Sequence, residues 1–245
     1  MNDRIRLDLA LEQRGLAPSR ARARDAILRG TVTINGATAL KQNQMVGKED
    51  QLALSDPAAN YVSRAALKLV AGLDAAGIVA AGKVCLDVGA STGGFTQVLM
   101  ERGATRIYAV DVGHGQLHQR LRGSDRVVNI EGVNARDLTR EQIAEPVDVL
   151  VSDVSFVSVT KVLAAPLALC TPGAMAVILF KPQFEVGRKN VGKGGIVTSA
   201  PAIAEALDAV IAFMAAQGFA HRLSVASPIT GGDGNRETVM VFGRD

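Results

Sequence analysis

The stretch Val84–Phe95, VCLDVGASTGGF, decides the fold, because it has the pattern of a strand, a glycine-rich loop and the start of a helix. Such a loop follows the first strand at its carboxyl end, where doubly wound sheets bind their ligands. The glycines do not follow the G-x-G-x-x-G spacing, so a cradle for a pyrophosphate is poorly supported. An ordinary α/β turn has the same appearance. The stretch therefore predicts an α/β domain, with a candidate ligand crevice beside the loop.

The rest of the chain after this stretch alternates helices with strands. We expect one helix from Ser63 to about Ala76 and another from Ser199 to Gln217, whose apolar residues recur at helical spacing. No helix separates the last two predicted strands, so they should form an antiparallel hairpin. The prediction is a Rossmann-like, mostly parallel sheet of seven strands that ends in this hairpin. The predicted strands are 84–88, 107–110, 127–130, 147–151, 175–180, 220–226 and 238–242.

The first part of the chain has a different pattern. A helix is expected after Ser19, a typical N-cap residue, and Gly30 should end it. The dipeptide Asn35-Gly36 between β-branched residues predicts a hairpin. The expected organisation is a small α+β domain at 1–56, a linker at 57–62 and a large domain at 63–245.

The overall composition is that of a soluble globular protein. Of the 245 residues, 48% are hydrophobic and 21% are charged, and the net charge is +3. The uncharged run 162–180 is broken by Pro166 and by the turn expected at 171–173, so we expect no membrane span and no signal peptide. Two isolated cysteines indicate a reducing, cytoplasmic location, and His114 with His118 lacks a third ligand, so no metal is expected.

Two aspartates give the crevice a candidate ligand. Asp111 ends the second strand, where a carboxylate can accept both hydroxyls of a ribose. Asp87, at the end of the first strand, suits a ligand with a positive group better than a diphosphate. S-adenosylmethionine has a ribose, a sulfonium cation and an amino acid end, so it fits both positions.

A second glycine-containing stretch, 187–193, is GRKNVGK and matches G-x-x-x-x-G-K. A phosphate-binding P-loop needs Ser or Thr at the next position to hold magnesium, and Gly194 stands there. We therefore reject a nucleotide triphosphatase. The basic residues of this loop would either contact nucleic-acid phosphates or simply be solvated.

Charged side chains also follow the buried strands of the large domain. Asp153 follows the strand at 147–151, Lys181 follows the strand at 175–180, and Glu237 begins the last strand. Lys68 lies on the helix before the first strand. Carboxyl ends of strands in this type of sheet face the ligand crevice. These four residues would form either a catalytic cluster or a buried network of ion pairs that is only structural.

Together these motifs identify a family. The chain resembles, over essentially its whole length, the hemolysin A-like (TlyA) ribosomal RNA 2′-O-methyltransferases, which join an S4 RNA-binding domain to an FtsJ-type methyltransferase domain. Ala65 departs from the glycine expected there. The motifs that carry the resemblance are Arg4–Asp8, Ser19–Ala23, Ile27–Gly30, Tyr61–Arg64, Asp87–Phe95, Ser152–Phe156, Lys181–Glu185, Gly192–Gly195 and Gly234–Glu237.

The resemblance implies a class I methyltransferase fold, S-adenosylmethionine as cofactor, and cytidines of 23S and also 16S ribosomal RNA, within ribosomal subunits, as substrate. It places a catalytic tetrad on Lys68, Asp153, Lys181 and Glu237. Implied cofactor contacts are Asp87, Gly89, Ala90, Ser91, Gly93, Phe95, Asp111, Val112, Asn134 (where relatives often have Asp) and Asp153. Expected RNA contacts are Arg4, Arg6, Arg20, Arg22, Arg24, Arg29, Arg64, Arg188, Lys189 and Lys193.

Our mechanistic hypothesis is that Lys181 contacts the ribose 2′-hydroxyl and steers its proton or the negative charge that develops. Asp153 would orient Lys181 and approach the methyl region, Lys68 and Glu237 would complete the network, and we expect Lys181 to face both Asp153 and Glu237. Three alternatives stay open at this point. They are a non-catalytic RNA-binding protein, a membrane-lytic hemolysin and a small-molecule methyltransferase. The last would leave the arginines between residues 14 and 29 unexplained.

Overall fold

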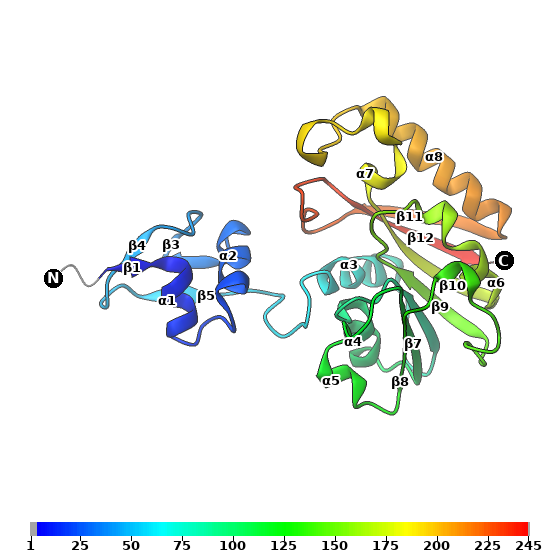
Figure 1. The fold of residues 1–245 in the computed structure, drawn as a ribbon, viewed down its shortest axis with the longest axis horizontal. Coiled ribbons are helices and arrows are strands. Elements are labelled where there is room, and N and C mark those ends of the chain that lie inside the picture. Colours follow the sequence, from blue (N-terminus) through cyan, green and yellow to red (C-terminus); the bar gives the residue numbers. More distant parts are fainter. Residues whose placement is uncertain (1–3, 245) are drawn as a thin grey trace. The chain divides into compact units, whose positions relative to one another are not determined.

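The computed structural model describes residues 4–244 and consists of two compact units that divide between Asn60 and Tyr61 (Figure 1).

The N-terminal unit is a small α+β body. The Ser19 side chain accepts a hydrogen bond from the backbone N–H of Arg22 (3.3 Å), which caps the second helix as expected. Asn35 and Gly36 both have positive φ, so the hairpin at this point is tight. The strands form a three-stranded sheet, β3-β2-β5, and a separate β1-β4 pair. The elements are β1 (Ile5–Arg6), α1 (Leu7–Gln13), α2 (Arg20–Leu28), β2 (Val32–Ile34), β3 (Ala37–Thr38), β4 (Met45–Val46) and β5 (Leu52–Leu54).

The C-terminal unit contains the predicted seven-stranded sheet. Its strand order is β11-β12-β10-β9-β6-β7-β8, in which β12 runs antiparallel to both of its neighbours, β10 and β11, and the other neighbouring pairs are parallel. This confirms the predicted fold class. The elements up to the fourth strand are α3 (Ala66–Ala76), β6 (Val84–Val88), α4 (Gly94–Glu101), β7 (Arg106–Asp111), α5 (Gln119–Arg122), β8 (Val127–Glu131), η1 (Ala135–Asp137) and β9 (Val147–Ser152). The remaining elements are η2 (Val159–Lys161), α6 (Ala164–Ala168), β10 (Cys170–Phe180), α7 (Pro182–Glu185), η3 (Arg188–Asn190), η4 (Lys193–Gly195), α8 (Ala200–Ala216), β11 (Phe219–Ala226) and β12 (Thr238–Arg244).

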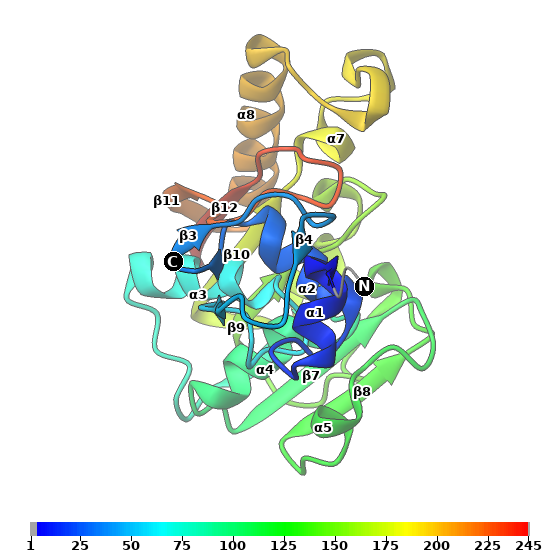
Figure 2. The same cartoon turned by 90° about the vertical axis from the view of Figure 1, so that its left-hand side faces the viewer.

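Helices cover both faces of this sheet, and α8 and α4 lie on opposite sides of the strands (Figures 1 and 2). On one face, Leu69 of α3 and Val98 of α4 pack against strand residues such as Val177. On the other face, α6 and α8 bury residues that include Val210 and Met214. Strands covered on both faces are almost continuously apolar, which explains the run in β10 that precedes Lys181.

Two local expectations differ from the structure. The predicted turn at 171–173 is part of β10, where Gly173 has a positive φ and the pairing with β9 shifts register between Cys170 and Met175. The helix expected from Ser63 begins at Ala66, after a turn. Within residues 4–244, none of the helices has the length and apolar character that crossing a membrane requires.

Candidate active site

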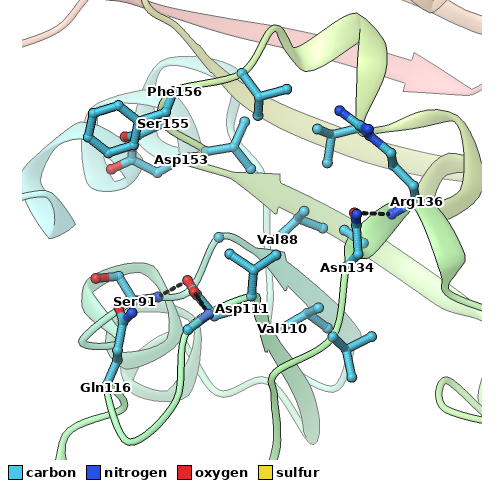
Figure 3. Close-up of a pocket in the computed structure, with 18 residues that line it drawn as sticks. Val88, Ser91, Val110, Asp111, Gln116, Asn134, Arg136, Asp153, Ser155 and Phe156 are labelled. Atoms are coloured by element: carbon cyan, nitrogen blue, oxygen red, sulfur yellow. Dashed lines mark hydrogen bonds between the residues drawn. The ribbon is translucent and has the colours of Figure 1, made fainter.

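A cavity of about 660 Å³ lies at the carboxyl ends of β6, β7 and β9. These strands include the point where the sheet reverses its strand order, because β7 lies on one side of β6 and β9 on the other. Figure 3 shows Asp153 and Phe156 on one side of the cavity and Asp111 and Ser91 on the opposite side. An open α/β sheet binds ligands at this position.

Asp111, at the end of β7, fixes the glycine loop to the cavity wall. One carboxylate oxygen accepts from the backbone N–H of Ser91 and the other from that of Gly113, both at 2.8 Å (Figure 3). A carboxylate has about four acceptor positions, so Asp111 retains acceptor capacity for hydroxyls in the cavity. Gly89 is required here, because a Cβ on it would lie 3.0–3.1 Å from Val154 at a φ of +84°.

The other predicted cofactor residues occupy three different environments. Val112 and Asn134 line the large cavity, and the Asn134 oxygen accepts from the backbone N–H of Arg136 at 3.1 Å (Figure 3). Ala90 and Phe95 line a smaller neighbouring cavity of about 150 Å³. Gly93 lines neither cavity. It packs instead against the side chains of Leu117 and Leu121, which leave no space for a Cβ at this position.

Asp87 lies behind the loop and is fully buried. One carboxylate oxygen accepts from the hydroxyl of Thr96 at 2.6 Å, and the other has no hydrogen-bond partner in the described part of the chain. The pKa of Asp87 is raised to about 7, chiefly by burial and also by the nearby Asp153, although the Thr96 hydrogen bond lowers it. Asp87 lines neither cavity, so it could favour a cationic group at the loop through its charge from behind the loop but not by direct contact. Thr96 gave no recognisable signal in the sequence.

Glu131 supports the wall of the large cavity that contains Gln116, on the same side as Ser91 and Asp111 (Figure 3). Its carboxylate accepts three consecutive backbone N–H groups, of Gly115, Gln116 and Leu117, at 2.6–2.8 Å. These hydrogen bonds hold the pKa of Glu131 below its ordinary value. Gln116 lines the cavity, so Glu131 shapes the wall without touching the space itself. Sequence analysis missed this residue, because its partners are backbone groups of a separate loop.

The four predicted catalytic residues form two ion pairs. Lys181 Nζ lies 2.6 Å from Asp153 Oδ1, and Lys68 Nζ lies 2.5 Å from Glu237 Oε2. Lys68, Lys181 and Glu237 are all buried, with 4–6% of their surface exposed. The expectation that Glu237 faces Lys181 differs from this geometry, because α3 packs against β12 and brings Lys68 to Glu237 instead. Asp153 and Lys181 both line the smaller cavity.

Two residues of the loop after β9 were not singled out from the sequence. The Ser155 hydroxyl accepts from Lys181 Nζ at 2.6 Å and lines both cavities. Phe156 is 92% exposed, adopts a positive φ of 67°, and its ring centroid lies 5.4 Å from that of Phe184. A bulky residue at positive φ is a genuine outlier, and strained backbone of this kind clusters at functional sites. Glu185, which is half-buried, holds the loop by accepting from the backbone N–H of Val159 at 2.9 Å, and its partial burial raises its pKa.

Each predicted RNA contact in the N-terminal unit has a hydrogen-bond or ion-pair partner within that unit, but the arginines differ in exposure. Arg6 and Arg20 both donate to Asp8 at 3.0 Å, and Arg6 in particular holds the pKa of Asp8 at about 2. Arg29 is 13% exposed and is bidentate to Asp56 at 2.7 Å, so it serves the unit's own structure. The other three arginines also have partners. Arg4 forms an ion pair with Asp50, Arg22 donates to the backbone oxygen of Ala58, and Arg24 donates to the side chain of Gln42.

The predicted RNA contacts of the C-terminal unit lie on two loops. Arg188, Lys189 and Lys193 are exposed on the segment after α7, and Arg64 lies in the turn before α3. Arg236, between Asn235 and Glu237, is a further exposed basic residue that sequence analysis did not select. Residues 4–244 contain no group of three or more His, Cys, Asp or Glu side chains arranged to hold a metal ion.

The strand order, the crevice at the order reversal and the carboxylate at the end of β7 define a Rossmann-like methyltransferase. Comparison with known proteins agrees with this class. Residues 61–244 match the FtsJ-like methyltransferase family and residues 5–52 match the S4 domain. A structure of an S-adenosylmethionine-dependent methyltransferase from Mesorhizobium loti shares the fold at 15% identity, with a TM-score of 0.54 over 73% of this chain and 98% of that one.

The chain belongs to the TlyA family of FtsJ-like methyltransferases. It is 45% identical to the 16S/23S rRNA (cytidine-2′-O)-methyltransferase TlyA of Mycobacterium tuberculosis, over 97% of this chain and 89% of that protein. It is 39% identical to Hemolysin A of Brachyspira hyodysenteriae, over 97% and 99% of the two chains. A solved hemolysin-type structure from Streptococcus thermophilus is 34% identical and superposes with a TM-score of 0.76, over 100% of this chain and 90% of that one.

Proposed function

We propose that this methyltransferase moves a methyl group from S-adenosylmethionine to the ribose 2′-hydroxyl of cytidine in ribosomal RNA, in the large subunit and also in the small one. The observation that carries the proposal is the ion pair between buried Lys181 and half-buried Asp153, which lines the cavity next to the ligand crevice. The Mycobacterium tuberculosis relative supports the nucleotide and both RNA classes, since its name states them. A ribosomal RNA substrate implies a cytoplasmic location.

The residues of the crevice fit S-adenosylmethionine. Asp111 has acceptor capacity left for ribose hydroxyls, and the buried carboxyl of Asp87 behind the loop would favour the cofactor's cationic groups through its charge. Asn134 and Val112 line the part of the cavity after β7 and β8, where they would hold the adenine. When bound, the cofactor supplies an activated methyl group. Gly89, Ala90 and Ser91 would position it, because the loop lines both cavities.

Lys181 acts on the substrate oxygen. Its ammonium group is oriented by three oxygens, which are Asp153 Oδ1 at 2.6 Å, the Asp153 backbone oxygen at 3.2 Å and the Ser155 hydroxyl at 2.6 Å. In our proposal Lys181 exchanges its longest contact, to the Asp153 backbone oxygen, for the 2′-oxygen and stabilises the negative charge that develops there, while the hydroxyl proton passes to the Asp153 carboxylate as the methyl group is transferred. Lys181 would also hold the 2′-oxygen in line with the methyl group, and this alignment of the reacting atoms can lower the activation barrier more than the handling of the proton does. Lys68 and Glu237 complete the tetrad as a buried ion pair whose two charges cancel.

Phe156 would hold the base of the target nucleotide. Its exposed ring stands at the cavity wall and is supported by Phe184. An unstacked base in single-stranded RNA is commonly held by stacking on an aromatic side chain. A ring kept exposed by a strained backbone is suited to this task better than to packing within the protein.

The N-terminal S4 unit, for which we propose the boundaries 1–56, would dock on RNA through its exposed arginines, while the basic loop of residues 187–195 adds phosphate contacts. Phosphate contacts position a protein on nucleic acid, whereas shape and splayed bases provide specificity. Arg29 is the predicted RNA contact that we would now exclude, because its guanidinium is already bound by Asp25 and Asp56.

The direct test is methyl transfer from labelled S-adenosylmethionine to ribosomal RNA, both naked and within isolated subunits, followed by mapping of the modified nucleotide. We expect a 2′-O-methylcytidine. Labelling of a base atom, or the absence of labelling on every RNA and subunit while the cofactor binds, would refute the proposed reaction. Deleting residues 1–56 without loss of activity would favour a small-molecule substrate, and leakage of liposomes would revive the lytic alternative.

A further inference from the structure

Asn235 is a buried polar residue that the tetrad does not account for. Only 2% of its surface is exposed. Its side-chain oxygen accepts from the backbone N–H of Val197 at 2.9 Å, and its side-chain nitrogen donates to the backbone oxygen of Gly195 at 2.8 Å. Both ends of one amide are therefore committed to a segment that lies about 40 residues earlier in the chain.

That segment, residues 187–197, we call the basic segment. It follows α7 directly and contains η3 and η4. Arg188, Lys189 and Lys193 project from it and are exposed, whereas Val197 at its end is buried. A loop with two short 3₁₀ turns and few buried side chains has little packing of its own to fix its position. The two hydrogen bonds from Asn235 fasten the end of the segment that follows Lys193.

The turn that carries Asn235 also holds Glu237. The backbone oxygen of Asn235 accepts from the N–H of Gly231 at 2.9 Å. A Cβ on Gly231 would lie 2.6 Å from Glu237 Oε1, so this turn packs directly against the carboxylate that pairs with Lys68. The position of Asn235 and the position of the Glu237 carboxylate are therefore set by the same turn.

We propose that Asn235 is a positioning residue that fastens the basic segment to the turn carrying Glu237, so that phosphates held by the segment keep the substrate in register with the tetrad. This inference rests on the proposed RNA substrate. An amide is required because the segment presents one donor and one acceptor. Aspartate at this position would accept from Val197 but would oppose the Gly195 oxygen with a second acceptor.

The test is a double-mutant cycle in the full-length protein with ribosomal RNA as substrate. One variant is Asn235→Ala, the second is the triple change Arg188→Ala, Lys189→Ala and Lys193→Ala, and the third combines both. Melting temperature and the dissociation constant for S-adenosylmethionine are measured on each. Asn129→Ala, an exposed asparagine on β8, is the matched control and should behave as wild type.

We expect Asn235→Ala to raise KM for the RNA about tenfold and the triple variant to raise it at least as much. The combined variant should have the same KM as the triple variant, because the effects of substitutions that act through each other are not additive. Cofactor affinity should not change, and Asn235→Asp should resemble Asn235→Ala. Three results would overturn the inference: additive effects in the combined variant, a triple variant with wild-type KM, or weakened cofactor binding in Asn235→Ala. If wild-type protein does not methylate RNA at all, the proposed function fails instead, so the two failures are distinguishable.

Discussion

Replacing Lys68 by methionine tests whether the second ion pair is catalytic or only structural. Lys68 and Glu237 are 6% and 4% exposed and lie 2.5 Å apart, so Lys68→Met leaves a carboxylate buried without its partner. Breaking a buried pair from one side costs about 3–5 kcal/mol, whereas removing both charges is often close to neutral. Lys68→Met should therefore lose about 3 kcal/mol of unfolding free energy. For a unit of this size that loss corresponds to a melting temperature lower by about 10 °C.

The double variant Lys68→Met with Glu237→Gln should recover most of this stability but no activity, since it lacks two members of the tetrad. Urea unfolding followed by circular dichroism gives the stability, and methyl transfer to ribosomal RNA gives the activity. Lys83→Met is the control, because Lys83 is exposed on the loop before β6 and surface changes stay within about 0.5 kcal/mol. A loss below about 1 kcal/mol for Lys68→Met would contradict our description of the pair. A double variant that is both stable and active would show that the pair has no part in catalysis.

Three further predictions follow from individual contacts. Burial raises the pKa of Asp87 to about 7 from 3.8, so its contribution to stability is complete below pH 4 and is lost as the pH rises through 7. In urea unfolding of the cofactor-free protein, the unfolding free energy of Asp87→Asn relative to that of wild type should rise by about 2–3 kcal/mol from pH 5 to pH 8. Parallel pH profiles of the two proteins would contradict this. Glu131→Gln should weaken S-adenosylmethionine binding about tenfold in calorimetry, because its new amide opposes one of three backbone donors, and an unchanged affinity would refute the role of Glu131. Phe156→Ala should raise KM for RNA by about tenfold or more while Phe156→Tyr stays close to wild type, and equal KM values would exclude base stacking.

The architecture could be predicted from the sequence because its signals are local. The apolar run that ends at Phe180, the N-cap at Ser19 and the Asn35-Gly36 turn each specify their element through near neighbours. Strand order cannot be found in this way, since pairing depends on residues far apart in the chain. The alternation of helices and strands predicted the type of sheet, which the structure confirms, whereas the strand order comes from the structure itself. The local reading was wrong at Gly173, where β10 absorbs the predicted turn as an irregularity at its start.

The candidate site was predictable only in part. Asp111, Asp153 and Lys181 could be placed at the crevice because strand ends in this fold share one edge. The partner of Glu237 could not be predicted, because it depends on how α3 packs against β12. Asn235 and Glu131 form their contacts with backbone groups of distant loops, so no residue type marks their partners.

In the proposed mechanism Lys181 acts on the 2′-hydroxyl of a cytidine in ribosomal RNA. The measurement that tests it most directly is the single-turnover rate of methyl transfer to that RNA for wild type and Lys181→Ala, with the cofactor dissociation constant and the melting temperature measured on both. We predict that Lys181→Ala binds the cofactor, stays folded and transfers methyl at least about a hundredfold more slowly, the range expected when a group that manages a proton is removed. Transfer by Lys181→Ala at the wild-type rate would exclude this role of Lys181.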